Sequence, residues 1–183
     1  MNHTMTETQA RLSVENEIRA AFKSVELGKG MSLREAQRED RVYGGHQGLP
    51  PTAPGAGITH DWSQVTLDEL ERDCIAHLDA LGFRYYIPAL MLSLLDHYDP
   101  GSMRVIGTLG SLYPKKGGIP EKGGEWQYHM QRYSLFNSQQ KAAIAHFLVA
   151  LPRLVELEPT DQRIVERALR NYWGEYLQPE PRS

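Results

Sequence analysis

The chain has little cysteine, no long apolar run and no large excess of charge of either sign. Its single cysteine, Cys74, excludes an internal disulfide and an all-cysteine zinc site. The longest apolar stretch, Ile87 to Leu95, is about half as long as a bilayer crossing requires. No basic segment followed by an apolar one opens the sequence, so we expect no secretory signal. These absences predict a cytoplasmic protein without a membrane segment.

The charge that is present is unevenly placed. The net charge of −3 and the pI near 6.2 argue against a broad surface for binding nucleic acid or an anionic membrane. Residues 61–79 nevertheless hold six acidic side chains against one arginine, whereas residues 104–132 hold five basic side chains against two acidic ones. A surface of one sign is either simply solvated or complementary to a partner of the opposite sign.

Most of the sequence has helical periodicity. Val14, Ile18 and Phe22 recur at helical spacing after Ser13, which predicts a helix from Ser13 to about Gly28. Two S/T-x-x-E capping boxes, at residues 32–35 and 66–69, predict helix starts, because each side chain satisfies a backbone N–H of the other residue. The second of these helices is expected to continue to a stop at Gly82.

The stretch "FRYYIPALMLSLLDHYDP" (83–100) is the part of the chain most densely filled with apolar and aromatic residues. Proline in the first turn of a helix loses no intrahelical bond, so Pro88 is predicted to begin a helix. The residues from Ala89 to Leu95 are apolar on more than one side, which predicts a helix in the centre of the fold. Arg84, Tyr85 and Tyr86 would then lie at the N-terminal end of this helix.

Further helices are predicted at about 102–112, after Asn137 and from about Pro159, whereas "WQYHMQRYSLF" (126–136) could hold a short strand. Two Gly/Pro-rich segments, 44–60 and 114–127, have little to bury and are predicted to be loops. The sequence therefore predicts a single, mainly α domain of five to seven helices over residues 13–177. Residues 1–12 are expected to be disordered, and 178–183 a frayed tail.

Three stretches in order resemble a family of small bacterial proteins known as a domain of unknown function. They are "EIRAAFKSVELGKGMSLREA" (17–36), "DW" (61–62) with "ALGFRYYIPALM" (80–91), and "YSLFNSQQKAAIAHFL" (133–148). The resemblance covers most of residues 17–151, and the C-terminal helix looks like an addition. It implies a shared fold and a bacterial source, but it transfers no activity and no catalytic residue.

No motif points to a metal, a cofactor or a catalytic centre. Cys74 and His77 lie one turn apart, but on a predicted core stripe, and "DHYDP" (96–100) is better explained as a polar helix end. "GKGMS" and "KKGG" lack the spacing of a phosphate-binding loop, and the chain has no nucleophile elbow. We therefore expect no metal and no cofactor, and we lean against an enzyme.

Two candidate sites remain. The polar residues around the predicted mouth of the central helix could converge, either as a structural lock in which Arg84 pairs with Asp61 or as a ligand pocket. This group comprises Asp61, Trp62, Arg84, Tyr85 and Tyr86.

The second candidate is an acidic helix face comprising Asp68, Glu71, Asp73 and Asp79. Such a face would suit a basic protein partner and give fast, salt-sensitive association. The leading hypothesis is therefore a non-enzymatic interaction protein, immunity- or antitoxin-like. The alternative is a small-ligand-binding protein or an enzyme with a pocket near Arg84 and Tyr85.

Overall fold

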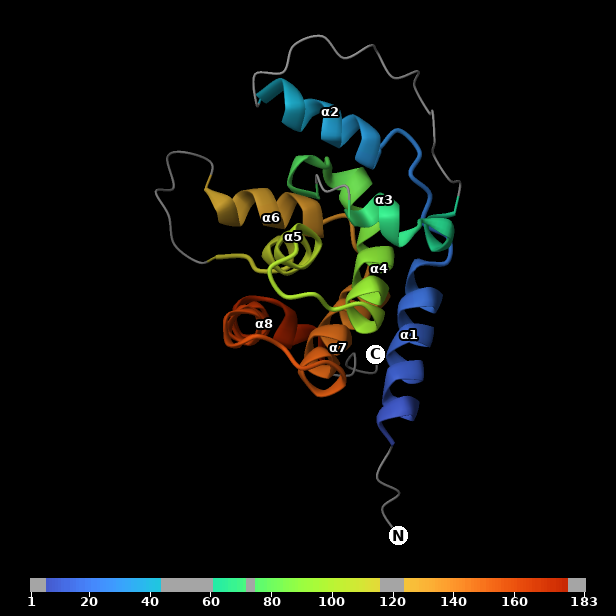
Figure 1. Ribbon diagram of the computed structural model, residues 1–183, viewed down its shortest axis with the longest axis vertical. Coiled ribbons are helices and arrows are strands. Elements are labelled where there is room, and N and C mark those ends of the chain that lie inside the picture. Colours follow the sequence, from blue (N-terminus) through green and yellow to red (C-terminus); the bar gives the residue numbers. More distant parts are fainter. Residues whose placement is uncertain (1–5, 44–60, 72–74, 116–123, 178–183) are drawn as a thin grey trace, which may run out of the picture.

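A computed structural model describes residues 6–43, 61–71, 75–115 and 124–177 (Figure 1). All regular structure in these residues is helical, which confirms the predicted all-α class. The α-helices are α1 (Glu7–Phe22), α2 (Leu33–Tyr43), α3 (Leu67–Glu71), α4 (Ala80–Asp96), α5 (Met103–Ser111), α6 (Glu125–Tyr133), α7 (Ser138–Leu154) and α8 (Pro159–Asn171). Short 3-10 helices are η1 (Trp62–Gln64), η2 (Ile75–His77) and η4 (Trp173–Leu177).

These described ranges hold more α-helices than the five to seven predicted. None of their helices combines the length and the apolar character that a bilayer crossing needs. The loop predicted at 44–60, Cys74, most of the loop at 114–127 and the tail 178–183 lie outside the described residues.

The centre of the fold is α4, as the sequence predicts. It contacts α1, α5, α6, α7 and η1, and runs through the middle of the molecule (Figure 1). From Pro88 to Leu95 only Leu92 is half-buried, and every other residue is buried. A helix that is apolar all round is stable only when other elements surround it, so α4 organises the packing of the remaining helices.

The predicted start of this helix is wrong. It begins at Ala80, where Asp79 accepts a hydrogen bond from the backbone N–H of Gly82 at 2.7 Å and thereby caps the first turn. Gly82 is therefore in the first turn instead of a stop, and Pro88 lies in the helix interior. Since proline has no N–H, the carbonyl of Arg84 loses its usual helical donor there.

Gly82 is required because another segment crosses α4 at this point. A Cβ at position 82 would lie 2.3 Å from the carbonyl oxygen of Met31. The neighbouring backbone N–H of Met31 donates to the Asp79 carboxylate at 3.0 Å. The stretch that joins α1 to α2 is thus held directly against the beginning of α4.

Two further boundaries differ from the predicted ones. The first helix begins at Glu7, because Thr6 and Gln9 form a capping box, so residues 7–12 belong to α1 and not to a disordered segment. The helix predicted from residue 67 to Gly82 is divided, since α3 ends at Glu71 and η2 follows at Ile75. Leu81, expected on its buried face, is 40% exposed.

The segment that could hold a strand is helix α6. Its buried residues His129, Arg132 and Tyr133 are three and four positions apart, which is the helical and not the strand period. Arg132 donates to the backbone carbonyls of Ile75 at 3.2 Å and Leu78 at 2.9 Å, so it fastens α6 to η2. The segment looks alternately polar and apolar only if Arg132 is taken as an exposed polar residue. Because Arg132 is buried, the alternation does not predict the helix.

The predicted helix starts at the two capping boxes are confirmed. Ser32 and Glu35 exchange hydrogen bonds of 2.8 and 3.2 Å, and Thr66 and Glu69 exchange bonds of 2.9 and 3.3 Å. Asn137 likewise caps α7, as predicted.

The first helix packs mainly on α7, and polar side chains hold the pair together. Arg11 donates to the carbonyl of Leu95 and, at 3.0 Å, to that of Leu154. Both carbonyls are in the last turns of their helices, where the chain itself supplies no donor. Arg11 therefore caps the C-terminal ends of α4 and α7 at once.

An aromatic cluster forms the other half of the core. The ring of Tyr133 lies 4.6 Å from that of Trp173 and 5.1 Å from that of Tyr172, measured between centroids. The indole N–H of Trp173 donates to the carbonyl of Leu112 at 2.7 Å. Trp173 is fully buried.

His129 is buried at the edge of this cluster. The Tyr133 hydroxyl donates its only proton to the Ser111 carbonyl at 2.6 Å, so it accepts from Nδ1 of His129 at 3.2 Å. Burial, and secondarily the charge of Arg132, lowers the pKa of His129 below 6.5. The folded protein therefore holds this imidazole neutral.

The stability of the protein should consequently fall in mild acid. Below pH ~6.5 the unfolded chain binds a proton at residue 129 that the folded chain resists, so unfolding becomes more favourable as the pH drops towards the folded-state pKa. Urea unfolding at about pH 7.5 and about pH 5 measures the loss. In His129→Gln the loss should be smaller than in the wild type, and an equal loss would contradict this assignment.

The close approach at Gly82 gives a second test. Gly82→Ala should lower the free energy of unfolding by about 1–3 kcal/mol, because the new methyl group overlaps the Met31 carbonyl. Gly110→Ala is the matched control, since Gly110 is also helical and nothing lies within 4 Å of its added Cβ. Its free energy of unfolding should be unchanged or up to about 1 kcal/mol higher. Equal effects in urea unfolding would contradict the contact.

Candidate functional site

The residues of the predicted acidic face do not all have the same role. Asp68 and Glu71 are exposed on α3. Asp73 lies outside the described residues. Asp79 is exposed, but its carboxylate accepts the N–H groups of both Gly82 and Met31 and so has a structural role. The face available to a partner is therefore centred on α3.

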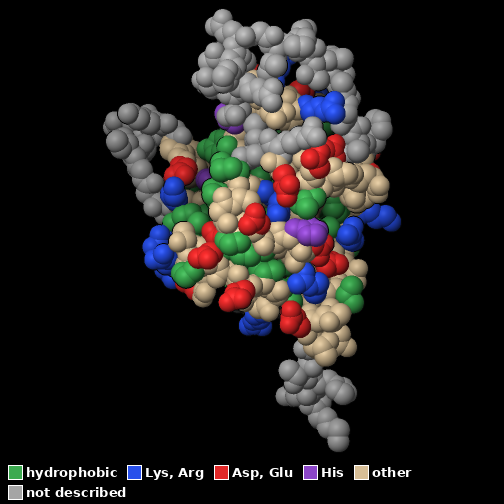
Figure 2. All heavy atoms as spheres, in the orientation of Figure 1, with side chains coloured by type: hydrophobic (Ala, Val, Ile, Leu, Met, Phe, Trp, Pro, Cys, Tyr) green, Lys and Arg blue, Asp and Glu red, His purple; other side chains and the backbone are tan. Residues whose placement is uncertain are grey.

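Next to α3, helix α5 exposes apolar side chains. Met103 is 57% exposed and Ile106 is 48% exposed, and α5 packs directly against α3. Figure 2 shows acidic and hydrophobic side chains interspersed over the face where these two helices lie. An exposed apolar pair on one helix and exposed carboxylates on the helix that packs against it together have the composition of a protein-binding surface.

The three-residue spacing of apolar residues that predicts α5 does not by itself show which face of this helix is exposed. Met103, Ile106, Leu109 and Leu112 recur every three residues, and three residues turn a helix by only about 300°. The repeat therefore drifts around the helix, and only its second half, Leu109 and Leu112, is buried. The exposure of Met103 and Ile106 could have been found from this drift.

A buried arginine lies below this surface. Arg104 is 2% exposed and donates to the Ser93 hydroxyl at 3.0 Å and to the carbonyl of His97, while its Nε has no hydrogen-bond partner. Burial lowers the pKa of Arg104, and the negative charges of Glu71 and Asp99 partly oppose that shift. Glu71 and Asp99 therefore both lie within electrostatic range of the N-terminal end of α5.

The second predicted group, around the mouth of the central helix, does not form one site. Tyr85 and Tyr86 are buried in the core, and burial raises the pKa of Tyr86 to about 12. Its hydroxyl oxygen accepts a long hydrogen bond of 3.4 Å from the N–H of Leu33. Arg84 is half-buried in the interior of α4, with its Nε buried and without a partner.

Asp61 and Trp62 lie elsewhere, on η1. The indole N–H of Trp62 donates to the carbonyl of Phe22 at 2.8 Å, which satisfies the C-terminal end of α1. Asp61 accepts from the N–H of Ser63 at 2.9 Å, and this hydrogen bond lowers the pKa of Asp61. Both Asp61 and Arg84 are described, and no ion pair joins them, so the proposed lock is absent.

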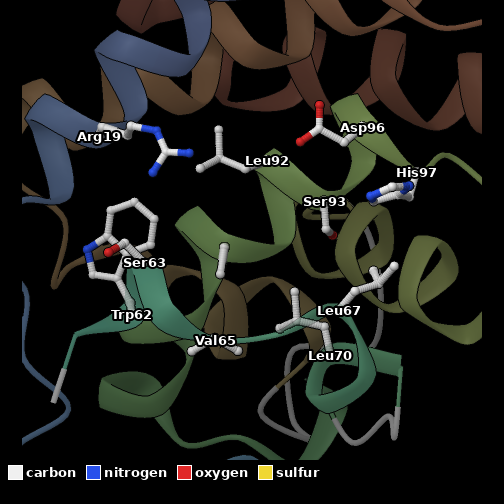
Figure 3. Close-up of a pocket in the computed structure, with 11 residues that line it drawn as sticks. Arg19, Trp62, Ser63, Val65, Leu67, Leu70, Leu92, Ser93, Asp96 and His97 are labelled. Carbon is white, nitrogen blue, oxygen red and sulfur yellow. The ribbon is translucent and has the colours of Figure 1, made fainter. Parts of the chain in front are cut away.

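The structure instead places two adjoining hollows between α1, η1, α3 and α4, with volumes of about 200 and 330 Å³ (Figure 3). They share Arg19, Trp62 and Ser63, and we call the combined depression the η1 groove. Of the predicted pocket residues it contains Asp61 and Trp62 only. Sequence analysis could not find it, because its walls come from elements that are far apart in the chain.

Within the ranges that the structure describes, no three histidine, cysteine or acidic side chains are grouped to hold a metal ion.

The fold and these surfaces define an all-helical protein with two candidate binding regions. The chain belongs to a family of unknown function, DUF6714, whose model matches residues 10–177. The match includes α8 and η4, so the C-terminal helix is part of the family and not an addition. No curated protein and no solved structure matches the chain.

The two roles of the acidic residues can be separated by mutation. Asp79→Ala removes the acceptor of two backbone N–H groups and should lower the free energy of unfolding by about 1–2 kcal/mol. Glu71→Ala, on the exposed face of α3, should change it by less than about 0.5 kcal/mol. Urea unfolding of both variants shows whether each carboxylate stabilises the fold. If Asp79→Ala leaves the free energy of unfolding unchanged, Asp79 has no structural role and belongs to the acidic surface.

Proposed function

We propose that this protein is a non-enzymatic interaction protein that binds a basic protein partner through α3 and α5. The observation that carries the proposal is the contact between α3 and α5, because α3 carries the exposed carboxylates of Asp68 and Glu71 and α5 carries the exposed side chains of Met103 and Ile106. An immunity- or antitoxin-like role, in which binding neutralises the basic partner, is the form of this function that we favour.

The two components of the surface would act at different stages of binding. Carboxylates attract a basic partner over roughly 10 Å at moderate salt, which raises the association rate. The apolar side chains supply contact area that is removed from water in the complex, which lowers the dissociation rate. The partner segment should therefore be an amphipathic element with lysine or arginine along the borders of an apolar stripe.

The surface near Arg104 also favours a cationic partner. The Arg104 guanidinium is buried below the N-terminal end of α5, and Glu71 and Asp99 are the acidic groups whose charges act on it. Two carboxylates therefore stand against one guanidinium in this part of the surface, so its local charge is negative by one. A cation placed there meets a net attractive potential.

The test is affinity capture from cells that make the protein, with the wild-type chain and variants as baits. Asp68→Lys with Glu71→Lys should lose a basic protein that the wild type retains, and Met103→Ser with Ile106→Ser should lose the same protein. Raising the salt concentration should weaken capture by the wild type. All four side chains are exposed or at a surface, so circular dichroism should show the variants folded.

The matched control is Glu156→Lys with Glu166→Lys, which reverses two exposed charges beyond α7 and on α8. This variant has the same change in net charge and should capture the same protein as the wild type. If the three variants and the wild type capture the same proteins, or if only acidic proteins are captured, the proposal is wrong.

A further inference from the structure

The η1 groove has a chemistry unlike that of the α3–α5 surface. One part is apolar, because Val65, Leu67, Leu70 and Leu92 line it. Leu92 is the one residue between Pro88 and Leu95 that is not fully buried, so the central helix is uncovered at this point. Leu92, Leu70 and Trp62 line this hollow from α4, α3 and η1 respectively (Figure 3). The half-buried side chains of Val65, Leu67 and Leu92 offer contact to a ligand's hydrocarbon chain.

The other part of the groove is cationic. Arg19 and Lys23 line it from the end of α1, and both are exposed. They are four positions apart, so their like charges repel, and among the described residues neither takes part in an ion pair. In Figure 3 the Arg19 side chain extends across the groove towards Leu92. An anion between the two cations would relieve their repulsion.

Attraction to the C-terminal end of α1 is a weaker explanation for the two cations. The last carbonyls of that helix already have donors, since Gln140 binds the carbonyl of Ala21 at 3.2 Å and Trp62 binds that of Phe22 at 2.8 Å. The carboxylate of Asp61, which also lines the cationic part, accepts the N–H of Ser63 and keeps its negative charge, so the two cations exceed it by one positive charge. The positive charge of Arg19 and Lys23 is thus left to face the groove.

The far end of the groove is polar, but most of its groups are engaged. Ser93 donates to the carbonyl of Leu90 at 2.8 Å and accepts from Arg104 at 3.0 Å. Asp96 lies 3.5 Å from Arg11. A second charged group of a ligand would therefore gain little there, which favours a ligand with a single charged end.

We propose that the η1 groove binds a small amphipathic anion, a carboxylate with a short hydrocarbon chain. The carboxylate lies between Arg19 and Lys23, and the chain extends along the half-buried side chains of Val65, Leu67 and Leu92. The site does not depend on the α3–α5 surface, because Leu67 and Leu70 line the groove whereas Asp68 and Glu71 are not among its lining residues.

The experiment is isothermal titration calorimetry of the full chain with decanoate, kept below its micelle concentration. Decanol, which lacks the charge, and decyltrimethylammonium, which reverses it, are the matched probes. Decanoate should bind saturably and at least about tenfold more tightly than either, since a desolvated charge contact is worth about 1.4 kcal/mol or more. Absent or equal binding of decanoate and decanol would overturn the proposal.

Variants locate the site. Arg19→Gln with Lys23→Gln should weaken decanoate about tenfold or more and leave decanol unchanged. Leu92→Glu, which places a negative charge in the apolar part, should abolish decanoate binding. Arg167→Gln with Arg170→Gln, two exposed cations of α8, is the control with the same change in net charge and should bind as the wild type does.

If the control and the groove variants lose the same affinity, binding is a net-charge effect and the proposal is wrong. Should Leu92→Glu fail to fold, the double arginine–lysine variant still decides the question, because both its side chains are exposed. The capture of basic proteins is tested with variants of α3 and α5 and not with variants of the groove. Absence of decanoate binding would therefore leave the proposed interaction function unaffected.

Discussion

The burial of α4 is the constraint on which the rest of the structure depends. A helix with apolar side chains on every face cannot stay in water, so helices from both halves of the chain must surround it. Its interior proline does not interrupt it, because the surrounding packing outweighs the loss of one hydrogen bond. Between residues 88 and 95 only Leu92 is half-buried, and it lines the η1 groove.

Side chains from distant parts of the sequence complete the ends of several helices. Arg11 binds the last turns of α4 and α7, Trp62 binds that of α1, and Trp173 binds the carbonyl of Leu112 just after α5. Each bond supplies a donor to a carbonyl that has none within its helix. Since these donors fix where each helix ends relative to its neighbours, they contribute orientation as well as stability.

The fold class and most helix starts could be predicted from the sequence because they depend on neighbouring residues. The boxes at Ser32 and Thr66 need only a partner three residues away, and the apolar run after Pro88 is a local signal of burial. The start of α4 could not be predicted, because the choice between Ala80 and Pro88 is made by Asp79, which also binds Met31 from another segment. The strand expected at residues 126–136 fails for the same reason, since Arg132 finds its partners in η2.

The candidate sites were harder to predict than the fold. Trp62 was grouped with Arg84 and its neighbouring tyrosines because all were expected around the start of the central helix, but in space Trp62 lies with Arg19 and Leu92. The acidic face was predicted from a local concentration of charge, whereas the structural use of Asp79 depends on a contact 48 residues away. Local sequence patterns show the charge and polarity of a segment. Tertiary contacts determine which of its side chains remain available for binding.

The pairing of α1 with α7 also has a consequence during synthesis. The bonds from Arg11 to Leu154, from Glu17 to His146 and from Gln140 to Ala21 span 143, 129 and 119 residues. While the ribosome is still making the middle of the chain, the first helix has no α7 to dock on, and its apolar side Val14, Ile18 and Phe22 stays uncovered. The amino-terminal helix can therefore complete its packing only after the chain has been made as far as α7, although α4 can contact it earlier.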